Sequence, residues 1–404
     1  MRADVVVIGA GPAGCAAAWT LARAGADVAL LDRSELPRDK VCGDALSPEC
    51  LRILEDMGLA AAAEGALPIE GSIVRAPDGA AMSTLAERPG ATLRRRDLDA
   101  ELTRRVQRAG ARLFPGRTLT DFRLRQDGIE VGCAGGEVFA GQCAVLATGA
   151  NAAALRTAGA LGRPAGPAAY ACRAYFRGGR LPENLILHSF DPFLLPGFAW
   201  VFPLPGGLFN VGVAAHVLPD QRLDLKRRFR RFIDDSPAAR RYLAGARRVS
   251  ELEWAPVRMS LRGARLVGER LLVAGDAAGG ANPCNGEGIT TALATGRLAG
   301  RSVLDGLRVG DLSRRRLAGY ERAVRAEYGE RFRRAEWVRR WLRWPAALNR
   351  LVAAGRGDRR LADALCWTLT GLRPLHSVLS VRTLSRCLLG ALCSCRAGRV
   401  GIQW

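Results

Sequence analysis

The segment that most constrains the fold is an apolar strand followed at once by glycines and a helix. Residues 5–8 are predicted to form the strand, and Gly9, Gly11 and Gly14 follow in the pattern G-x-G-x-x-G. A second predicted strand, 27–31, ends in Asp32, eighteen residues after Gly14. Such glycines let a backbone approach a pyrophosphate, and the acidic residue binds ribose hydroxyls. This order predicts a dinucleotide-binding α/β unit.

A second glycine-rich turn lies far downstream. The predicted strand 270–274 runs into Gly275-Asp276, and a helical pattern starts near Glu287. A turn from strand to helix points backbone N–H groups and the positive helix end at one spot. A tight turn with spare glycines is the simpler interpretation. We prefer ligand binding, because the same chain carries a dinucleotide pattern at its start.

Size and composition indicate a globular protein of two or three domains. The chain has 404 residues and no run of eighteen apolar residues, so no membrane-spanning helix is expected. The N-terminus enters a strand directly, which indicates no signal peptide. Eleven cysteines lack zinc-like pairing, and most are expected to be reduced in a cytoplasmic protein. His188, His216 and His376 do not cluster, so no metal site is predicted.

Positive charge is high and uneven. The net charge is +21, almost all from arginine, and residues 314–360 hold fifteen Arg against five acidic residues. A GC-rich genome explains this composition, and so does an anionic partner. No nucleic-acid motif is present. Trp337, Trp341 and Trp344 recur at helical spacing in this segment, and Leu348 and Leu351 extend the stripe. This pattern fits either a helix packed on the core or one lying on an anionic membrane surface.

Between these landmarks, periodicity predicts the remaining elements. Ser47 and Pro48 are typical of a helix start, and a further helix is expected over 93–109. A β-meander is predicted from Arg112 to Ala140. From Ala168 the period becomes two, which predicts a sheet with two helices interrupting it, and beyond Tyr320 the pattern is helical.

Cys42 lies in a loop just before the helix that starts at Pro48. A free cysteine is usually an inert, buried, small hydrophobe. Here the residue has Gly43 after it and lies close to Lys40 and Asp44. Chemistry and structure are therefore equally good explanations of this cysteine.

Three segments together carry a family resemblance. They are Pro37-Arg38-Asp39-Lys40-Val41-Cys42-Gly43-Asp44, Pro196-Gly197-Phe198-Ala199-Trp200-Val201-Phe202-Pro203 and Asn282-Pro283-Cys284-Asn285-Gly286-Glu287-Gly288-Ile289. The chain resembles the geranylgeranyl reductase family of flavoproteins over nearly its whole length, including the menaquinone-reductase-like members. The family has the p-hydroxybenzoate-hydroxylase-type FAD fold. Two positions depart from the family pattern, Phe198 in place of Tyr and Ala214 in place of Gly. Thr148 also stands where related flavoproteins often have Asp.

The resemblance implies a Rossmann-like FAD-binding domain, an inserted antiparallel-sheet substrate domain and a helical C-terminal region. The expected FAD-binding segments are 1–72, 92–160 and 262–319, the substrate domain is 73–91 and 161–261, and the helical region is 320–404. The expected cofactor-binding residues are Gly9, Gly11, Ala13, Gly14, Asp32, Arg33, Lys40, Cys42, Gly43, Arg95, Gly149, Gly275, Asp276, Pro283, Gly286, Gly288 and Ile289.

The implied reaction saturates a C=C bond of a prenyl chain, with hydride from reduced FAD and a proton from the Cys42 region. Cys42 is the expected catalytic residue, and Phe198, Trp200, Phe202, Pro203 and Gly212 are the expected substrate-binding residues. The electron donor is NAD(P)H or ferredoxin. A peripheral monomer on the inner face of the cell membrane is expected, which meets a prenyl lipid and an anionic surface. Alternatives on the same fold are a flavin monooxygenase and a non-enzymatic prenyl-binding escort protein.

Overall fold

The structure is a computed structural model that describes residues 1–162, 168–218 and 223–370. The chain forms two compact units, each built from three separate segments. The first unit comprises Met1–Gly65, Leu93–Tyr170 and Ala255–Arg333, and the second comprises Ala66–Thr92, Ala171–Trp254 and Arg334–Trp404. The chain thus leaves the first unit and returns to it twice.

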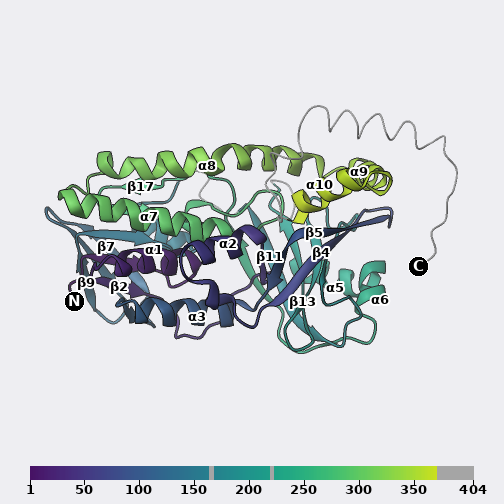
Figure 1. The fold of residues 1–404 in the computed structure, drawn as a ribbon, viewed down its shortest axis with the longest axis horizontal. Helices are drawn as coiled ribbons and strands as arrows, with labels where there is room; N and C mark the ends of the chain where they lie inside the picture. Colours follow the sequence, from purple (N-terminus) through teal and green to yellow (C-terminus); the bar gives the residue numbers. More distant parts are fainter. Residues whose placement is uncertain (163–167, 219–222, 371–404) are drawn as a thin grey trace. The chain divides into compact units, whose positions relative to one another are not determined.

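The first unit contains a six-stranded sheet in the order β17-β18-β10-β1-β2-β6 (Figure 1). Strands β18 to β6 are parallel, and β17 is antiparallel at the edge. The central strands consist of buried apolar residues, as expected for strands covered on both faces. The strands of this sheet are β1 (Val5–Ile8), β2 (Val28–Leu31), β6 (Arg112–Phe114), β10 (Cys143–Leu146), β17 (Val267–Gly268) and β18 (Leu271–Val273).

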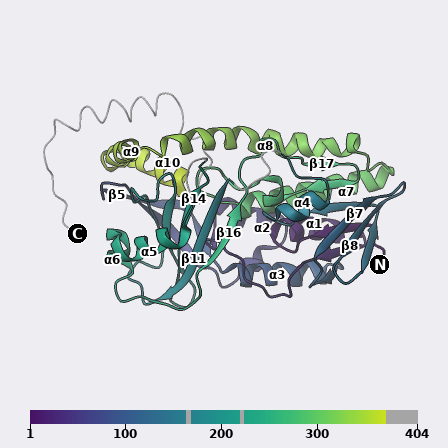
Figure 2. The same cartoon turned by 180° about the vertical axis from the view of Figure 1, so that it is seen from behind.

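A separate three-stranded antiparallel sheet, β7-β8-β9, lies beside α4 (Figure 2). Its strands are β7 (Leu119–Leu124), β8 (Ile129–Cys133) and β9 (Val138–Gly141), and α4 is Ala152–Thr157. The sequence prediction that the meander begins at Arg112 is wrong. The strand β6 pairs with β2 in the six-stranded sheet instead. Alternation marks a strand but does not indicate which sheet it joins.

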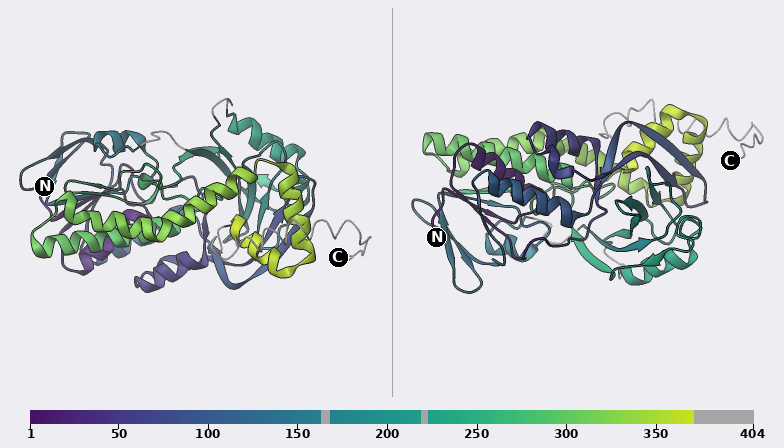
Figure 3. Two further views of the ribbon diagram at one scale, coloured as in Figure 1. Left: turned by 90° about the horizontal axis from the view of Figure 1, so that it is seen from above. Right: turned by 60° about the horizontal axis from the view of Figure 1, so that its bottom comes forward.

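Two helices of the first unit, α1 and α7, pack closely against each other. A Cβ atom on Gly296 of α7 would lie 2.1 Å from the carbonyl oxygen of Ala13, so a glycine there permits the close approach of the two helices. Figures 1 and 3 show α7 and α8 side by side. The helices and short elements of this unit are α1 (Pro12–Arg23), β3 (Ala45–Leu46), α2 (Pro48–Asp56), the 3-10 helix η1 (Ala60–Ala63), α3 (Arg95–Arg108), the 3-10 helix η2 (Gly275–Ala278), α7 (Ile289–Val309) and α8 (Arg314–Trp341), of which the residues from Arg334 on belong to the second unit.

The second unit is built on a large sheet with the strand order β15-β11-β14-β13-β12-β4-β5. The pairs β15–β11, β14–β13, β13–β12 and β4–β5 are antiparallel, and β12 and β4 are parallel. The strands are β4 (Leu67–Arg75), β5 (Ala81–Thr92), β11 (Ala169–Arg177), β12 (Leu185–Ser189), β13 (Phe198–Leu204), β14 (Leu208–His216) and β15 (Arg247–Arg248), and β16 (Glu253–Val257) follows.

Alternation along these strands gives the sheet two apolar faces. One face packs with α5 (Leu225–Asp235) and α6 (Pro237–Tyr242) into a core that includes Val201, Val211 and Phe232. Near β4 and β5 the chain adds α9 (Pro345–Gly357) and α10 (Arg359–Thr370). The predicted helical region from 320 is confirmed for α8, α9 and α10, and the remainder, 371–404, lies outside the described residues, as does His376.

Candidate functional site

The first glycine turn leaves open space only at its middle glycine. Gly9 has a φ of +107°, and a Cβ atom there would lie 2.4 Å from the carbonyl oxygen of Ala147. A Cβ atom on Gly14 would lie 1.7 Å from the carbonyl oxygen of Gly9. Around Gly11, by contrast, the nearest atoms are guanidinium nitrogens of Arg95 and Arg38, 3.7 and 3.8 Å from a Cβ position. The turn therefore faces two cations at the N-terminus of α1, which suits a pyrophosphate.

Asp32 lies at the end of β2 beside this turn and is buried. Its carboxylate accepts hydrogen bonds from the backbone N–H of Ala10, at 2.8 Å, and of Ser34, at 3.0 Å. The expected cofactor residue Arg33, the next in the chain, is exposed. Asp32 is therefore held in place by the turn it adjoins, as a ribose-binding carboxylate must be.

Arg38 is a site residue that sequence reasoning missed. Its guanidinium forms ion pairs with Asp32 at 3.3 Å and with Asp99 at 3.0 Å. Asp99 is also held by Arg95, which donates to its two carboxylate oxygens at 2.9 and 2.8 Å. Burial lowers the pKa of Arg95, but the Asp99 carboxylate more than offsets this, so the net pKa is raised. Two fixed cations thus line the glycine turn.

Ala13 and Gly149 take different positions around the turn. The side chain of Ala13 packs against Gly275, 2.9 Å from a Cβ position there, and not into the turn. Gly149 has a φ of +62° and lies near the Lys40 side chain. Beside it, the hydroxyl of Thr148 is buried and has no hydrogen-bond partner among the described residues.

Cys42 is partly exposed and lies near Arg95. Burial raises the pKa of its thiol, Arg95 opposes this, and Asp44 adds to it, so the net pKa is raised. The neighbouring Asp44 is fully buried with a φ of +64°, and its carboxylate accepts the Arg95 backbone N–H at 3.0 Å. Asp44 is a strained residue between Gly43 and the short strand β3, and it fixes the path of this loop. Because its pKa is raised, the Cys42 thiol keeps its proton at neutral pH.

The second glycine turn brings Gly275, Asp276 and Gly288 together. Gly275 has a φ of +65°, and its N–H donates to the Thr295 hydroxyl at 3.0 Å. An Asp276 carboxylate oxygen lies 2.9 Å from a Cβ position on Gly288, so a side chain there would have to displace that carboxylate. Lys40 lies 3.9 Å from the same carboxylate. The structure thus joins residues from the first and last segments of this unit.

The loop before α7 is fixed by its own hydrogen bonds. The Asn282 side chain accepts the N–H of Cys284, and the Asn285 side chain accepts that of Glu287, each at 2.9 Å. The Glu287 carboxylate accepts the Thr290 N–H at 2.8 Å, in the first turn of α7. Burial raises the pKa of Glu287, and the bonds with Thr290 oppose the rise. Pro283 is buried and Gly286 has a φ of +75°, and Ile289 begins the helix.

Arg258 is a second residue that sequence reasoning missed. It is buried in the first unit, where burial lowers its pKa and Asp276 opposes the fall. An arginine held near Asp276 puts positive charge beside this expected cofactor-binding carboxylate. A single Arg in a strand pattern gave no signal for this position.

In the second unit, four of the five predicted substrate residues, Phe198, Trp200, Phe202 and Gly212, lie on one face of the sheet, and Pro203 lies on the other face of β13. Trp200 is buried, and its indole N–H donates to the Asn210 side chain at 2.8 Å. Its ring lies over Gly212, where a Cβ atom would be 2.2 Å from the indole. Gly212 therefore makes room for Trp200. Pro203 is buried on β13, and its carbonyl oxygen accepts from the Thr92 hydroxyl at 2.5 Å.

His188 shares this face with the aromatic residues. Its ring centroid lies 5.3 Å from that of Phe198 and 5.1 Å from that of Phe202. Burial lowers the pKa of His188 to about 3, so the ring is neutral. Its Nδ1 has no hydrogen-bond partner among the described residues. The face is thus aromatic and uncharged at these positions, as an apolar ligand requires.

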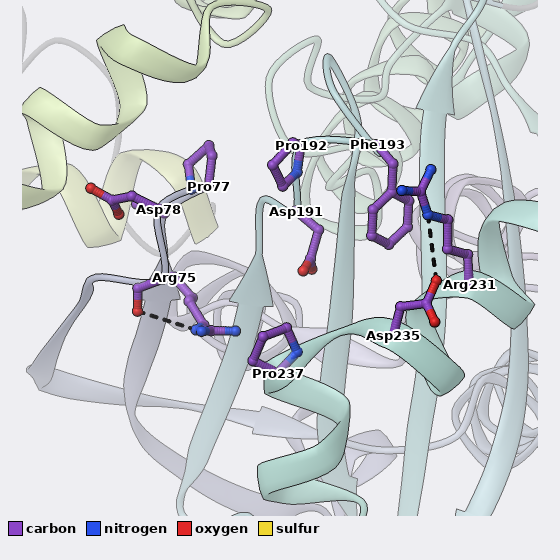
Figure 4. Close-up of a pocket in the computed structure, with 11 residues that line it drawn as sticks. Arg75, Pro77, Asp78, Asp191, Pro192, Phe193, Arg231, Asp235 and Pro237 are labelled. Carbon is purple, nitrogen blue, oxygen red and sulfur yellow. Dashed lines mark hydrogen bonds and ion pairs between the residues drawn. The ribbon is translucent and has the colours of Figure 1, made fainter.

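A cavity of about 310 Å³ also lies in the second unit, away from the predicted residues (Figure 4). Its charged groups already have partners. Arg231 pairs with Asp235 at 3.5 Å, and the Asp191 carboxylate accepts from Ser189 and Ser236 at 2.8 and 2.9 Å. None of the predicted site residues lines this cavity. It therefore adds nothing to the candidate site.

Comparison with known proteins places the chain in a family. The family described as FAD binding domain matches residues 2–132. A menaquinone reductase from Mycolicibacterium smegmatis is 32% identical over 328 residues, which cover 76% of this chain and 77% of that protein. A digeranylgeranylglycerophospholipid reductase from Methanopyrus kandleri is 32% identical over 355 residues, 84% and 90% of the two chains.

One solved structure shows the shared fold. It is a geranylgeranyl bacteriochlorophyll reductase-like protein from Thermoplasma acidophilum, with a TM-score of 0.79, 20% identity and 96% of each chain covered. The sequence prediction of family and fold is confirmed by these matches. This chain belongs to the geranylgeranyl reductase family of FAD-dependent oxidoreductases.

Proposed function

We propose that this protein reduces C=C bonds of a prenyl chain, on either a polyprenyl quinone or a geranylgeranyl lipid. Family membership supports the reaction class, since the two relatives are named as reductases of prenyl-bearing lipids. The observation that carries the proposal for this chain is the position of Cys42 near Arg95, in a loop that Asp44 fixes by accepting the Arg95 backbone N–H at 3.0 Å. A monooxygenase has no need of a proton donor at an alkene carbon.

The residues of the first unit fit FAD. Gly9 and Gly14 close the turn tightly, Gly11 leaves the room that a pyrophosphate needs, and Arg38 and Arg95 supply positive charge there. Asp32 suits the adenosine ribose, and Asp276 suits the ribityl chain. When bound and reduced, FAD supplies the hydride. NAD(P)H or ferredoxin would reduce it, and anaerobic bleaching of the flavin colour by each donor separately identifies which.

The chain's own residues supply the rest of the reaction. An isolated alkene has no carbonyl group to polarise it, so proton placement and geometry carry the catalysis. Hydride addition at one alkene carbon leaves the other to take a proton, and we assign that proton to the Cys42 thiol. The thiolate that remains is stabilised by the Arg95 guanidinium and recovers a proton from solvent.

The aromatic face of the second unit is proposed to bind the prenyl chain. Phe198, Trp200 and Phe202 are buried, and His188 is neutral. Burial of a chain of ~20 carbons contributes roughly 16 kcal/mol at ~0.8 kcal/mol per carbon. Such a face excludes water and needs few polar contacts to hold the substrate.

Mass spectrometry of a prenyl-lipid extract tests the proposal. The extract is incubated without oxygen with the chemically reduced enzyme, and the boiled enzyme serves as the control. We expect one class of prenyl lipid to gain two hydrogens per bond reduced, which also names the substrate. Gain of an oxygen atom in air with NAD(P)H, without anaerobic reduction, would instead identify a monooxygenase. A purified protein that holds no flavin would point to a prenyl-binding escort protein.

A further inference from the structure

The end of α8 and the start of α9 expose three tryptophans in the second unit. Trp337, Trp341 and Trp344 are 39%, 49% and 62% exposed. The rings of Trp337 and Trp341 contact each other, with centroids 5.7 Å apart. Large exposed aromatic residues in a cluster mark a surface that meets something apolar.

These tryptophans are not needed for the core. Other residues of the same segments form the core. Val338 in α8, Leu342 just after α8, and Leu348 and Val352 in α9 are all buried. The sequence prediction that the stripe continues through Leu348 is therefore wrong. Helix α8 ends at Trp341 and α9 begins at Pro345, and this break turns Leu348 inward. The tryptophans are thus far more exposed than the residues that form the core of this region.

The charge around the tryptophans is strongly positive. Residues 334–360 hold eight arginines against Glu336 and Asp358. Arg340 and Arg343 are exposed, and neither pairs with a carboxylate in the part of the chain that the structure describes. Trp337, Trp341, Trp344, Arg340 and Arg343 form what we call the Trp–Arg surface.

We propose that the Trp–Arg surface binds the face of an anionic lipid bilayer, so that the protein is peripheral. Indole rings favour the membrane–water interface, because one end is apolar and the other can hydrogen-bond. Arginine side chains add attraction to anionic headgroups. None of the helices in the described residues is long and apolar enough to cross a membrane. The surface suits contact with one leaflet.

Charge separates this partner from a second copy of the chain. A symmetric dimer through the same surface would bring Arg340 and Arg343 toward their own counterparts, and like charges in contact are unfavourable. A bilayer of anionic lipid offers the opposite charge together with an apolar layer. The proposed function explains why the protein would bind a membrane, since a prenyl lipid could then be taken directly from its bilayer, and the inference rests on the proposed function for this point alone.

Vesicle sedimentation of the full-length holoprotein tests the proposal. Vesicles of phosphatidylcholine alone are compared with vesicles of equal parts phosphatidylcholine and phosphatidylglycerol. We expect the Arg340→Gln, Arg343→Gln double variant to bind the anionic vesicles roughly 30-fold more weakly, at about fivefold per arginine. Replacing all three tryptophans by serine should weaken binding at least about tenfold. Added salt should weaken binding of the wild-type protein.

Matched controls use the same substitutions elsewhere. Trp254 is 66% exposed on β16, and Trp254→Ser should bind as the wild type does. Arg262 and Arg301 are also exposed, and their double substitution by Gln should leave anionic binding within about twofold. Flavin content and the unfolding midpoint show that each variant is folded.

Three results would overturn the proposal. One is a wild-type protein that does not sediment with the anionic vesicles. Another is wild-type binding by both the arginine and the tryptophan variants. The third is a dimer, seen by analytical ultracentrifugation, that the tryptophan substitutions convert to a monomer without changing vesicle binding. Turnover is not measured in this assay. Failure here with intact reduction of detergent-dispersed substrate therefore leaves the proposed function standing.

Discussion

At the scale of single residues, charged neighbours determine the state of Cys42. Burial and Asp44 raise the pKa of the thiol, and the Arg95 guanidinium lowers it, with a net rise. Arg95 itself is fixed by Asp99, and Asp44 by its bond with the Arg95 backbone. The loop thus holds a neutral thiol next to a cation that can stabilise a thiolate, which is the arrangement a proton donor needs.

Replacing Cys42 by Ser should keep the flavin and lower kcat by about 100-fold or more, since a hydroxyl is the weaker acid. Turnover of the wild type should be flat at neutral pH and should fall as pH rises through the raised pKa of the thiol. The serine variant should lose that alkaline limb. Cys133→Ser, in β8 of the same unit, should keep wild-type turnover. Unchanged turnover in the Cys42 variant would make Cys42 a structural residue.

The burial of neutral His188 predicts how the stability of the folded protein changes in acid. Its pKa in the folded state is about 3, whereas an unfolded histidine titrates near ~6.5. Below pH ~6.5 the unfolded chain binds a proton that the folded chain does not, so stability falls as pH falls toward 3. At pH ~5 this loss is about 2 kcal/mol. Urea unfolding of His188→Leu should show that much less difference between pH ~7 and ~5. An equal difference in variant and wild type would mean that His188 is solvated.

At the scale of elements, the contact of α1 with α7 holds the two glycine turns together. The turn before α1 carries Gly11, and the turn before α7 carries Asp276. Gly296 lies where the helices meet, with no room for a Cβ atom against the Ala13 carbonyl oxygen. The packing of two helices therefore determines how two ends of a bound dinucleotide can be held.

Gly296→Ala should destabilise the protein by about 1–3 kcal/mol, because the added methyl group overpacks the α1–α7 contact. A helical glycine with room for a Cβ atom gives the opposite sign. At Gly319 in α8, the nearest atom to a Cβ position is a side-chain nitrogen of Arg322 at 3.8 Å, an ordinary contact, and Gly319→Ala should stabilise by about 0.5–1 kcal/mol. Thermal unfolding with flavin fluorescence measures both. Stabilisation by Gly296→Ala would show that the helices do not approach this closely.

Local sequence patterns predicted the helices and strands. The site residues that were missed are held by partners that lie far away in the sequence. Strand, glycines and helix are adjacent in the chain, so the N-terminal turn could be predicted, as could the Ser47 cap of α2, which accepts the Cys50 N–H at 3.0 Å. Arg38 could not, because one partner, Asp99, is 61 residues away. Pro345 did mark the break between α8 and α9, since proline rarely continues a helix. The helical spacing of the tryptophans, which continues to Leu348, suggested a single helix through this proline instead.

At the scale of the whole molecule, the two units contribute different chemistry. The first holds glycine turns, paired charges and the Cys42 thiol, which suit a charged cofactor and a proton transfer. The second holds the aromatic residues of β13 with the neutral His188, and the Trp–Arg surface, which suit a lipid.

The most direct test of this account is a single anaerobic turnover with a purified prenyl lipid and enzyme whose flavin has been reduced beforehand. Flavin absorbance and product mass are followed together. The account predicts one C=C bond saturated, with a gain of two hydrogens, for each flavin oxidised, and a strongly slowed reaction in the Cys42→Ser variant. A flavin that stays reduced until air is admitted, and a product that then carries an added oxygen, would contradict it.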